Sequence, residues 1–519
     1  MVRQQEQAIS SLRGNALLGG KFVVSRAGEA YHAKFESGNP KSTIPMTDVS
    51  ETVRERTASA QGGVRRADRV YPPGPKSRVP GLIYLTLHRN PLAFLERMTR
   101  EYGEIVHMRL GPRHDYLISS PDYIESILQA PNEMARATQL SVKCLLGKGI
   151  LTSKGELHRR QKNLMLPYFR AQRNEAYVGA ILRCAARMSA RWKHGETRDI
   201  AVDMRHFALA VIAEALFGES MVEENLAEIC AHMDVILGMT SLGNNAVLDI
   251  LFNMWLTAGL PHPSGRRLRS SIQTLNAIVY RMIDRQRQAP RDQDNLLAGL
   301  CAQALDGEGR TQVRDEVMTM LLAGHETTAT ALTWTWYLLS ENPGAAEKMH
   351  AELDQVLGGR APTFKDLGQL TYTRNVFAES MRLYPPVWLM GRRPVRDFPV
   401  GDYVIPAGAH VHLCQFLVHR DPRWFPDPNR FEPLRWANGA EPPRPKGAYL
   451  PFAAGGRKCI GAELAWTEGV LALAVLGQQW RLRLVPGHPV EPQPRITLQP
   501  KHGLRMTVER RDAAPAANG

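Results

Sequence analysis

Apolar side chains recur every three to four residues along most of this chain, the spacing of helices that bury one face. The pattern predicts helices over residues 90–102, in several stretches between 174 and 287, over 313–339, around 377–382 and from 462 onward. Shorter alternating segments predict strands at 105–110, 116–119, 480–485 and 504–508, and a hairpin at 401–408. Helices should therefore outnumber strands.

The ends of the chain lack this periodicity. Residues 1–70 are polar and basic with few aromatic residues, and we predict a disordered N-terminal extension. The segment Tyr71-Pro-Pro-Gly-Pro75 is stiff and extended, and we expect it to open one large domain over residues 71–510. Residues 511–519 are expected to form a flexible tail.

Composition and net charge indicate what kind of macromolecule this protein binds. Hydrophobic residues make up 44% and charged residues 22% of the chain, as in an ordinary globular protein. The formal net charge is +14, but no nucleic-acid motif accompanies it, so we predict no nucleic-acid partner. An acidic protein partner fits the positive charge better, because complementary charge speeds docking.

The six cysteines are scattered and include no CxxC pair, which argues against a disulfide framework or a zinc site. Their distribution suits a reducing compartment. The N-terminus lacks the apolar core of a signal peptide, and no uninterrupted apolar run reaches the roughly 18 residues of a membrane span. We therefore expect a cytoplasmic protein without a transmembrane anchor.

One cysteine, Cys459, lies in a glycine-rich loop directly before the last predicted helix. The positive end of a helix favours an anion, and Arg457 and Lys458 should lower the pKa of the thiol further. Gly455 and Gly461 allow the backbone a close approach. Such a loop can present a thiolate to a flat metal cofactor, although most free cysteines are simply small buried hydrophobes.

The predicted helix over 313–339 contains the polar run Gly324-His-Glu-Thr-Thr328. His325 and Glu326 suggest a zinc-protease motif, but the second histidine required at position 329 is alanine. Glycine and threonine inside a helix reduce its stability, and such a local conflict is typical of a functional site. An exposed polar patch is the alternative interpretation.

The loop resembles a known signature. Phe452, Gly455, Arg457, Cys459 and Gly461 match the haem-binding motif of the cytochromes P450, and three further motifs of that family precede it in order. The resemblance implies a mainly α fold with a smaller β-rich region, and haem b as cofactor. Cys459 would be the thiolate ligand of the iron.

By the same resemblance, Gly324 opens a groove for dioxygen, while Thr327 and Glu326 deliver protons to it. His158, Lys162 and Arg392 would meet the haem propionates. In the first two positions the family more often has tryptophan and arginine. The remaining implied positions are substrate contacts: Ala323, Val387 and Leu389.

The family also has a structural cluster of one glutamate and two arginines. Glu379 and Arg382 lie three residues apart on a predicted helix, so they share a face. The segment Pro428-Asn-Arg430-Phe431 matches the element that supplies the second arginine, which we therefore predict to be Arg430.

The implied activity is insertion of one oxygen atom from O2 into a lipophilic small molecule, with a terpenoid expected. The chain has no flavin- or iron–sulfur-binding segment, so electrons should come from an external donor, expected to be a ferredoxin with its reductase. The alternatives are a fatty-acid hydroxylase, a peroxide-driven peroxygenase and, in a different class, a non-catalytic haem-binding sensor. The acid–threonine pair counts against the last two.

Overall fold

The structure is a computed structural model, in which residues 20–27, 30–37, 70–77, 82–110, 113–137, 140–218, 221–238, 263–288, 295–303, 307–437 and 444–511 are described. The chain divides into two units, residues 1–63 and 64–519. In the first unit, β1 (Gly20–Ala27) and β2 (Ala30–Ser37) form an antiparallel hairpin within the segment predicted to be disordered. The other residues of that unit, and the predicted tail beyond Arg511, lie outside the described residues.

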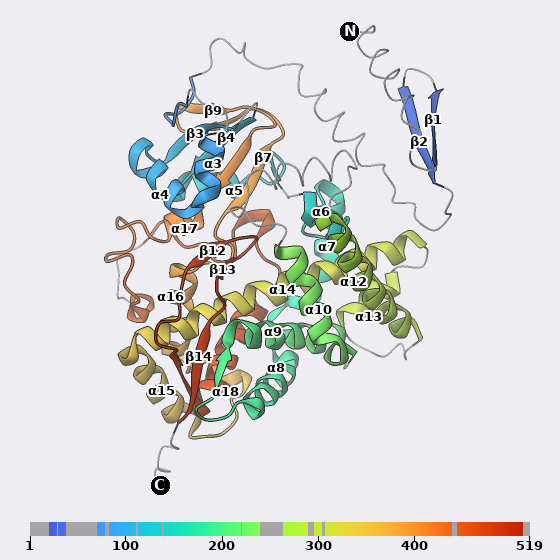
Figure 1. The fold of residues 1–519 in the computed structure, drawn as a ribbon. Helices are drawn as coiled ribbons and strands as arrows, with labels where there is room; N and C mark the ends of the chain where they lie inside the picture. Colours follow the sequence, from blue (N-terminus) through green and yellow to red (C-terminus); the bar gives the residue numbers. More distant parts are fainter. Residues whose placement is uncertain are drawn as a thin grey trace. The chain divides into compact units, whose positions relative to one another are not determined.

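Helices make up most of the second unit (Figure 1). In chain order they are α3 (Leu82–Arg89), α4 (Pro91–Tyr102), α5 (Pro121–Gln129), α6 (Leu140–Leu146), α7 (Gly155–Met165), α8 (Ala171–Arg191), α9 (Ile200–Phe217), α10 (Met221–Gly238), α12 (Pro263–Gln288), α13 (Leu296–Gln303), α14 (Gly307–Glu341), α15 (Pro343–Leu357), α16 (Thr371–Leu383), α17 (Gln415–Val418) and α18 (Ala462–Gln479). Short 3-10 helices lie between the α-helices: η2 (Leu166–Phe169), η3 (Phe364–Gly368), η4 (Pro433–Trp436), η5 (Lys446–Ala448) and η6 (Gly455–Arg457).

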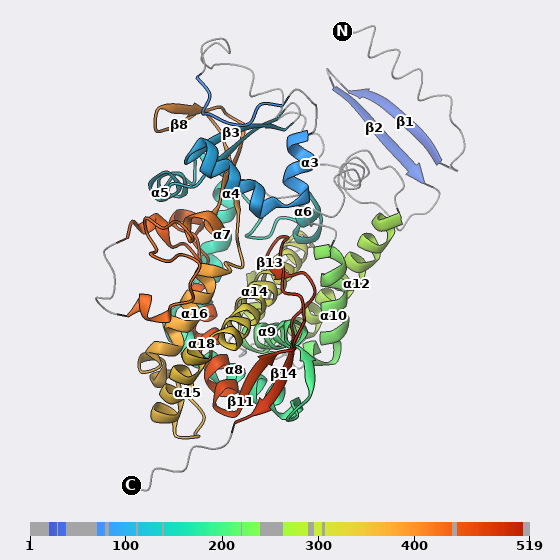
Figure 2. The ribbon, with the colours of Figure 1, turned by 60° about the vertical axis from the view of Figure 1, so that its left-hand side comes forward.

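The long helix α14 is the centre of this unit. It packs against α9, α12, α16 and α18, and Figure 2 shows it running between them. A helix that is enclosed on several sides needs apolar residues around most of its circumference, and Trp334, Trp336 and Leu332 are all buried. The predicted segment 313–339 is therefore a helix, extended by a few residues at each end.

The main sheet has five strands in the order β3-β4-β10-β7-β5. The strands are β3 (Ile105–Leu110), β4 (Arg113–Ile118), β5 (Met134–Arg136), β7 (Met390–Pro394) and β10 (His410–Leu413). Only the β4–β10 pair is parallel. Side chains alternate between its faces, and Tyr116, Val411 and Leu413 belong to the buried core on one of them.

Smaller β elements complete the unit. A three-stranded sheet has the order β11-β14-β6, with β6 (Thr197–Asp199), β11 (Trp480–Leu484) and β14 (Arg505–Arg510). Two hairpins are formed by β8 (Phe398–Val400) with β9 (Tyr403–Ile405) and by β12 (Pro492–Pro494) with β13 (Leu498–Pro500). The predicted mainly α fold with a smaller β-rich region is confirmed.

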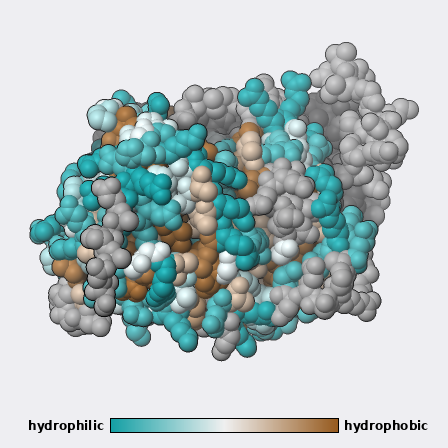
Figure 3. Space-filling view, turned by 90° about the horizontal axis from the view of Figure 1, so that it is seen from below, coloured by the Kyte–Doolittle hydropathy of each residue, from teal (hydrophilic) through white to brown (hydrophobic). Residues whose placement is uncertain are grey.

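The surface is predominantly polar on the face drawn in Figure 3, where apolar residues are scattered between polar ones and are most frequent near the middle. Among the described residues, every helix is either too short or too polar to cross a membrane.

Candidate active site

The cysteine loop is fixed by backbone hydrogen bonds at the start of α18. The Cys459 N–H donates to the carbonyl of Phe452 at 2.9 Å, and the Lys458 N–H donates to that of Gly455 at 3.1 Å. The helix begins at Ala462, with Gly461 as its N-terminal cap, as predicted. The backbone N–H of Gly461 donates to the Cys459 sulfur. The loop therefore supplies an amide donor to this thiol.

Gly455 is the glycine that this loop requires most clearly. Its φ is +66°, a conformation that side chains disfavour, and an added Cβ would lie 2.0 Å from the carbonyl oxygen of Leu128. The C-terminal end of α5 therefore packs directly on the backbone of the loop. At Gly461, by contrast, an added Cβ would meet only Phe169 at 3.7 Å, an ordinary contact.

The predicted lowering of the Cys459 pKa is wrong for the protein without its cofactor. Desolvation by the surrounding protein raises the pKa of this thiol, although the Gly461 N–H, Arg136 and Lys458 oppose that rise. The side chain is nevertheless exposed, which means that the sulfur faces an opening. A metal ion removes the proton from a coordinating thiol outright, so the thiolate would form on binding.

Cationic side chains from separate elements gather near the cysteine. Arg136 on β5 and Arg392 on β7 are register partners in the main sheet, and Arg457 follows on η6. Burial lowers the pKa of Arg136 to about 10, with Arg457 adding to the shift. Burial likewise lowers the pKa of Arg392 to about 9, with contributions from Arg136 and Arg457. His158 on α7 also feels Arg457, and its pKa falls to about 4, mainly through burial.

No carboxylate among the described residues contributes to the pKa shifts of Arg136, Arg392 or Arg457. Buried cations without anionic partners are costly, so this cluster is built to receive an anion. Two propionate groups supply such charge. The residues therefore fit haem b: Cys459 would be the iron ligand, and Arg136, His158, Arg392 and Arg457 would lie around the propionates.

Two basic side chains, those of Arg457 and Lys162, make hydrogen bonds that hold the loop in place. Arg457 donates to the carbonyls of Ser153 at 2.8 Å and Ile150 at 3.5 Å. Lys162 donates from Nζ to the carbonyl of Gly456 at 2.9 Å, which links α7 to the loop. The proposed contact of Lys162 with a propionate stays a prediction.

The middle of α14 borders an opening on one side. Ala323, Gly324 and Thr327 are half-buried, whereas the residues that flank them on the helix are buried. Positions 323 and 327 are one turn apart and share a face. Thr327 donates from Oγ1 to the carbonyl of Ala323 at 2.6 Å, which is the usual bond of a threonine hydroxyl within a helix.

Glu326 points to a different side of α14 and is buried. Its Oε1 accepts hydrogen bonds from Thr497 Oγ1 at 2.8 Å and from Gln499 Nε2, both at the β12–β13 hairpin. Its Oε2 is buried and has no hydrogen-bond partner among the described residues. This free oxygen is available to a water molecule, which the transfer of a proton would need.

Helix packing explains why position 324 is a glycine, which the sequence alone did not reveal. An added Cβ would lie 2.4 Å from Cδ1 of Ile212 on α9. The glycine thus permits close approach of α9 to α14, and its predicted groove for dioxygen stays untested.

The segment after α16 presents its apolar side chains in alternation. Val387 and Leu389 are half-buried, whereas Pro386, Trp388 and Met390 between and beside them are buried. Trp388 is anchored by its indole N–H, which donates to the carbonyl of Arg495 at 2.8 Å. Val387 and Leu389 are therefore held on the less enclosed side of a fixed extended segment.

A buried cluster behind the cysteine loop centres on Glu379. Both of its carboxylate oxygens accept from Arg382, Oε2 from Nε and Oε1 from Nη2, each at 2.8 Å. Arg435 donates from Nε to Oε1 at 3.2 Å, and the Trp436 indole donates to Oε2 at 2.9 Å. Glu379 and Arg382 are fully buried.

The second arginine of this cluster is Arg435, so the prediction of Arg430 is wrong. The Arg430 side chain is 67% exposed and pairs with Glu432 at 3.3 Å, while only its carbonyl accepts from Arg382. The sequence offered a signal for the correct residue. Pro433-Leu-Arg435-Trp436 repeats the proline–x–arginine–aromatic pattern five residues later.

Sequence reasoning also missed residues that belong to no motif. Arg136 comes to the site through the pairing of β5 with β7, about 250 positions apart in the chain. Thr497 and Gln499 come to Glu326 from a hairpin near the C-terminus. Only the folded chain brings these residues together.

Comparisons with known proteins agree with this geometry. The cytochrome P450 family profile matches residues 72–507. Cyclooctatin synthase of Streptomyces melanosporofaciens is 36% identical over 434 residues, covering 82% of this chain and 93% of the relative. Cyclooctat-9-en-7-ol 5-monooxygenase of the same organism is 35% identical, covering 78% and 87%. Pentalenene oxygenase of Streptomyces avermitilis is 29% identical, covering 82% and 94%.

The cysteine loop and the cationic cluster are those expected of a haem-thiolate protein, and the family match is nearly as long as the second unit. The chain belongs to the cytochrome P450 family. It is a haem b-dependent monooxygenase that incorporates oxygen from O2 and takes its electrons from a donor. When bound, the haem supplies the activation of O2, and the protein supplies binding and orientation.

The corrected cluster gives a test with a matched control. Arg435→Ala should destabilise the folded enzyme by about 3–5 kcal/mol, because it leaves the Glu379 charge buried with one partner fewer. Arg430→Ala removes an exposed ion pair and should cost no more than about 1 kcal/mol. Thermal unfolding of the two haem-loaded variants, measured side by side, checks this. Equal losses, or a larger loss for Arg430→Ala, would contradict the assignment.

Proposed function

We propose that this enzyme oxidises a terpenoid. One atom of O2 enters a C–H bond of the substrate, and the other leaves as water after two electrons and two protons have been taken up. The observation that carries the proposal is the set of relatives whose names refer to cyclooctatin, cyclooctat-9-en-7-ol and pentalenene. Two of these are aligned over most of the chain at 35–36% identity.

The residues expected to border the substrate are consistent with a lipophilic molecule. Ala323 on α14 and Val387 and Leu389 after α16 carry no polar side-chain atom, and all three are half-buried. An apolar skeleton would gain free energy by leaving water for such a surface, at roughly 25 cal/mol per Å² of apolar area. Orientation of the reacting carbon would then depend on shape rather than on hydrogen bonds.

Thr327 and Glu326 are proposed to deliver the protons. Thr327 lies on the less enclosed face of α14, where its hydroxyl can accept a hydrogen bond while it donates to Ala323. One oxygen of Glu326 has no hydrogen-bond partner in the part of the chain that the structure describes. A carboxylate that exchanges protons with water and a hydroxyl that passes them on make a relay of the kind that acid–base catalysis uses.

A ferredoxin with its reductase is proposed as the electron donor. Exposed cations lie on the cysteine loop and on α7 beside it, among them Lys458 and Arg160, and the chain carries a formal charge of +14. An acidic partner would be steered to such a surface. A rate of reduction by ferredoxin that stayed constant as salt concentration rose would contradict this part of the proposal.

The proton relay is tested by removing one hydroxyl without changing side-chain volume much. Thr327→Val should lower the yield of product per electron by about tenfold or more, because the electrons are then lost to peroxide. Thr335→Val is the matched control, since Thr335 makes the same bond to the carbonyl four residues earlier, two turns along α14. Simultaneous measurement of electron use, peroxide and product decides; unchanged coupling in Thr327→Val would refute the relay.

The substrate class is tested by binding. Cyclic sesquiterpenes and diterpenes should displace water from the haem iron and shift its spin state at micromolar concentration. Fatty acids of similar carbon number should do so only weakly. Optical titration of the ferric enzyme measures this, and a stronger response to fatty acids would favour the hydroxylase alternative instead.

A further inference from the structure

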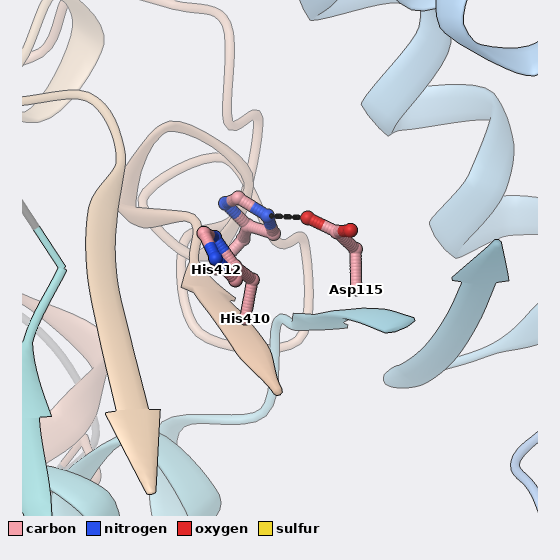
Figure 4. A group of neighbouring side chains, drawn as sticks. All are labelled: Asp115, His410 and His412. Atoms are coloured by element: carbon pink, nitrogen blue, oxygen red, sulfur yellow. Dashed lines mark hydrogen bonds and ion pairs between the residues drawn. The ribbon is translucent and has the colours of Figure 1, made fainter. Parts of the chain in front are cut away.

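The main sheet carries a second group of polar side chains, away from the cysteine loop. His410 and His412 are two residues apart on β10 and therefore lie on the same face, opposite to Val411 and Leu413. The parallel pairing of β10 with β4 places Asp115 directly beside His410. Figure 4 shows the three side chains turned toward one another. The opposite face of the sheet holds Arg392, Val411 and Leu413.

The geometry of these three side chains is that of a ligand set. One nitrogen from each histidine and one oxygen of Asp115 all lie within 4.8 Å of one another. His412 Nε2 and Asp115 Oδ1 are 2.7 Å apart. Ligand atoms that share one tetrahedral zinc ion are about 3.3 Å apart, so small side-chain rotations suffice to enclose an ion.

The chemical nature of the side chains is also suitable. Asp115 is fully buried, and its carboxylate is held by His412 and Arg113. A buried carboxylate and imidazole nitrogens are ligands that zinc accepts.

We propose that Asp115, His410 and His412 form a binding site for a divalent transition-metal ion of the zinc type. Three protein ligands leave a fourth position for water. The site would link β4 to β10, since Asp115 and His412 are separated by 297 positions in the chain. Because Arg392 lies on the other face of the same sheet, the metal would brace the part of the fold that carries it and would take no part in the reaction.

Two arginines also contact these three side chains, and each should affect metal binding in a different way. Arg113 donates from Nε to Asp115 Oδ2 at 2.9 Å, which leaves Oδ1 for the ion and orients the carboxylate. Arg393 contacts His410 Nε2 at 2.5 Å. Its side chain is exposed, so an arriving ion can displace it into solvent. Arg393 is therefore a competitor, and its removal should strengthen binding.

The test uses the haem-loaded, chelator-treated enzyme and zinc ion alone. Calorimetric titration at pH 7.5 should give one equivalent of bound zinc, accompanied by a rise in the thermal unfolding midpoint. His410→Gln and His412→Gln should each weaken binding by at least about tenfold. Arg393→Gln should tighten it several-fold. Diffraction data at the zinc absorption edge would locate the ion.

His502→Gln is the matched control. His502 lies 3.6 Å from Glu491, an exposed histidine–carboxylate pair that is in no three-ligand group among the described residues. This variant should bind zinc as the wild type does. Absence of binding at 100-fold excess of zinc, or equal affinity in wild type, His410→Gln and His412→Gln, would overturn the proposal. Weakened binding in Arg393→Gln would do the same, since the arginine would then support the site.

Discussion

The position of the cysteine loop depends on the hydrogen bonds and ion pairs made by the buried carboxylate of Glu379. This carboxylate binds Arg382 on its own helix and Arg435 and Trp436 on η4. Arg382 in turn donates to the carbonyls of His419 and Pro428, which belong to the segment that leads toward the loop. A fully buried network of this kind is costly to form and still more costly to break, which makes it a rigid support.

The cationic cluster near Cys459 differs from the Glu379 network, because its charges have no paired counter-charge in the described part of the chain. Arg136, Arg392 and Arg457 lie close together, and no carboxylate among the described residues contributes to the shifts of their pKa values. Their mutual repulsion destabilises the protein alone and is relieved by an anionic cofactor. Haem binding and the stability of the folded state are therefore expected to be coupled, as for any ligand that binds only the native chain. The Cys459 thiol is also in an environment that an incoming cofactor would change. Burial raises its pKa in the protein alone, and a bound metal ion would replace the proton.

The sequence was sufficient where one short segment carries the whole signal. The loop around Cys459, the helix with Thr327 and the pair Glu379–Arg382 were all predicted, as was the predominance of helices. It failed where neighbouring segments offer similar patterns, as with Arg430 and Arg435, or where pairing of distant strands creates a contact, as with Arg136. The predicted lowering of the Cys459 pKa was wrong as well, because that prediction considered only the nearby charges and ignored desolvation of the thiol. The packing of Ile212 against Gly324 depends on two helices and could not be read from either alone.

The most direct test of this account is the spectrum of the reduced, carbon monoxide-bound enzyme, in wild type and in Cys459→Ser. Cys301→Ser, which alters a partly exposed cysteine elsewhere, serves as the control. We predict the long-wavelength Soret band of thiolate ligation in the wild type and the control, and its loss in Cys459→Ser even where haem is retained. A thiolate-type band that survived in Cys459→Ser, or that was absent from folded, haem-loaded wild type, would contradict the assignment of Cys459 as the iron ligand.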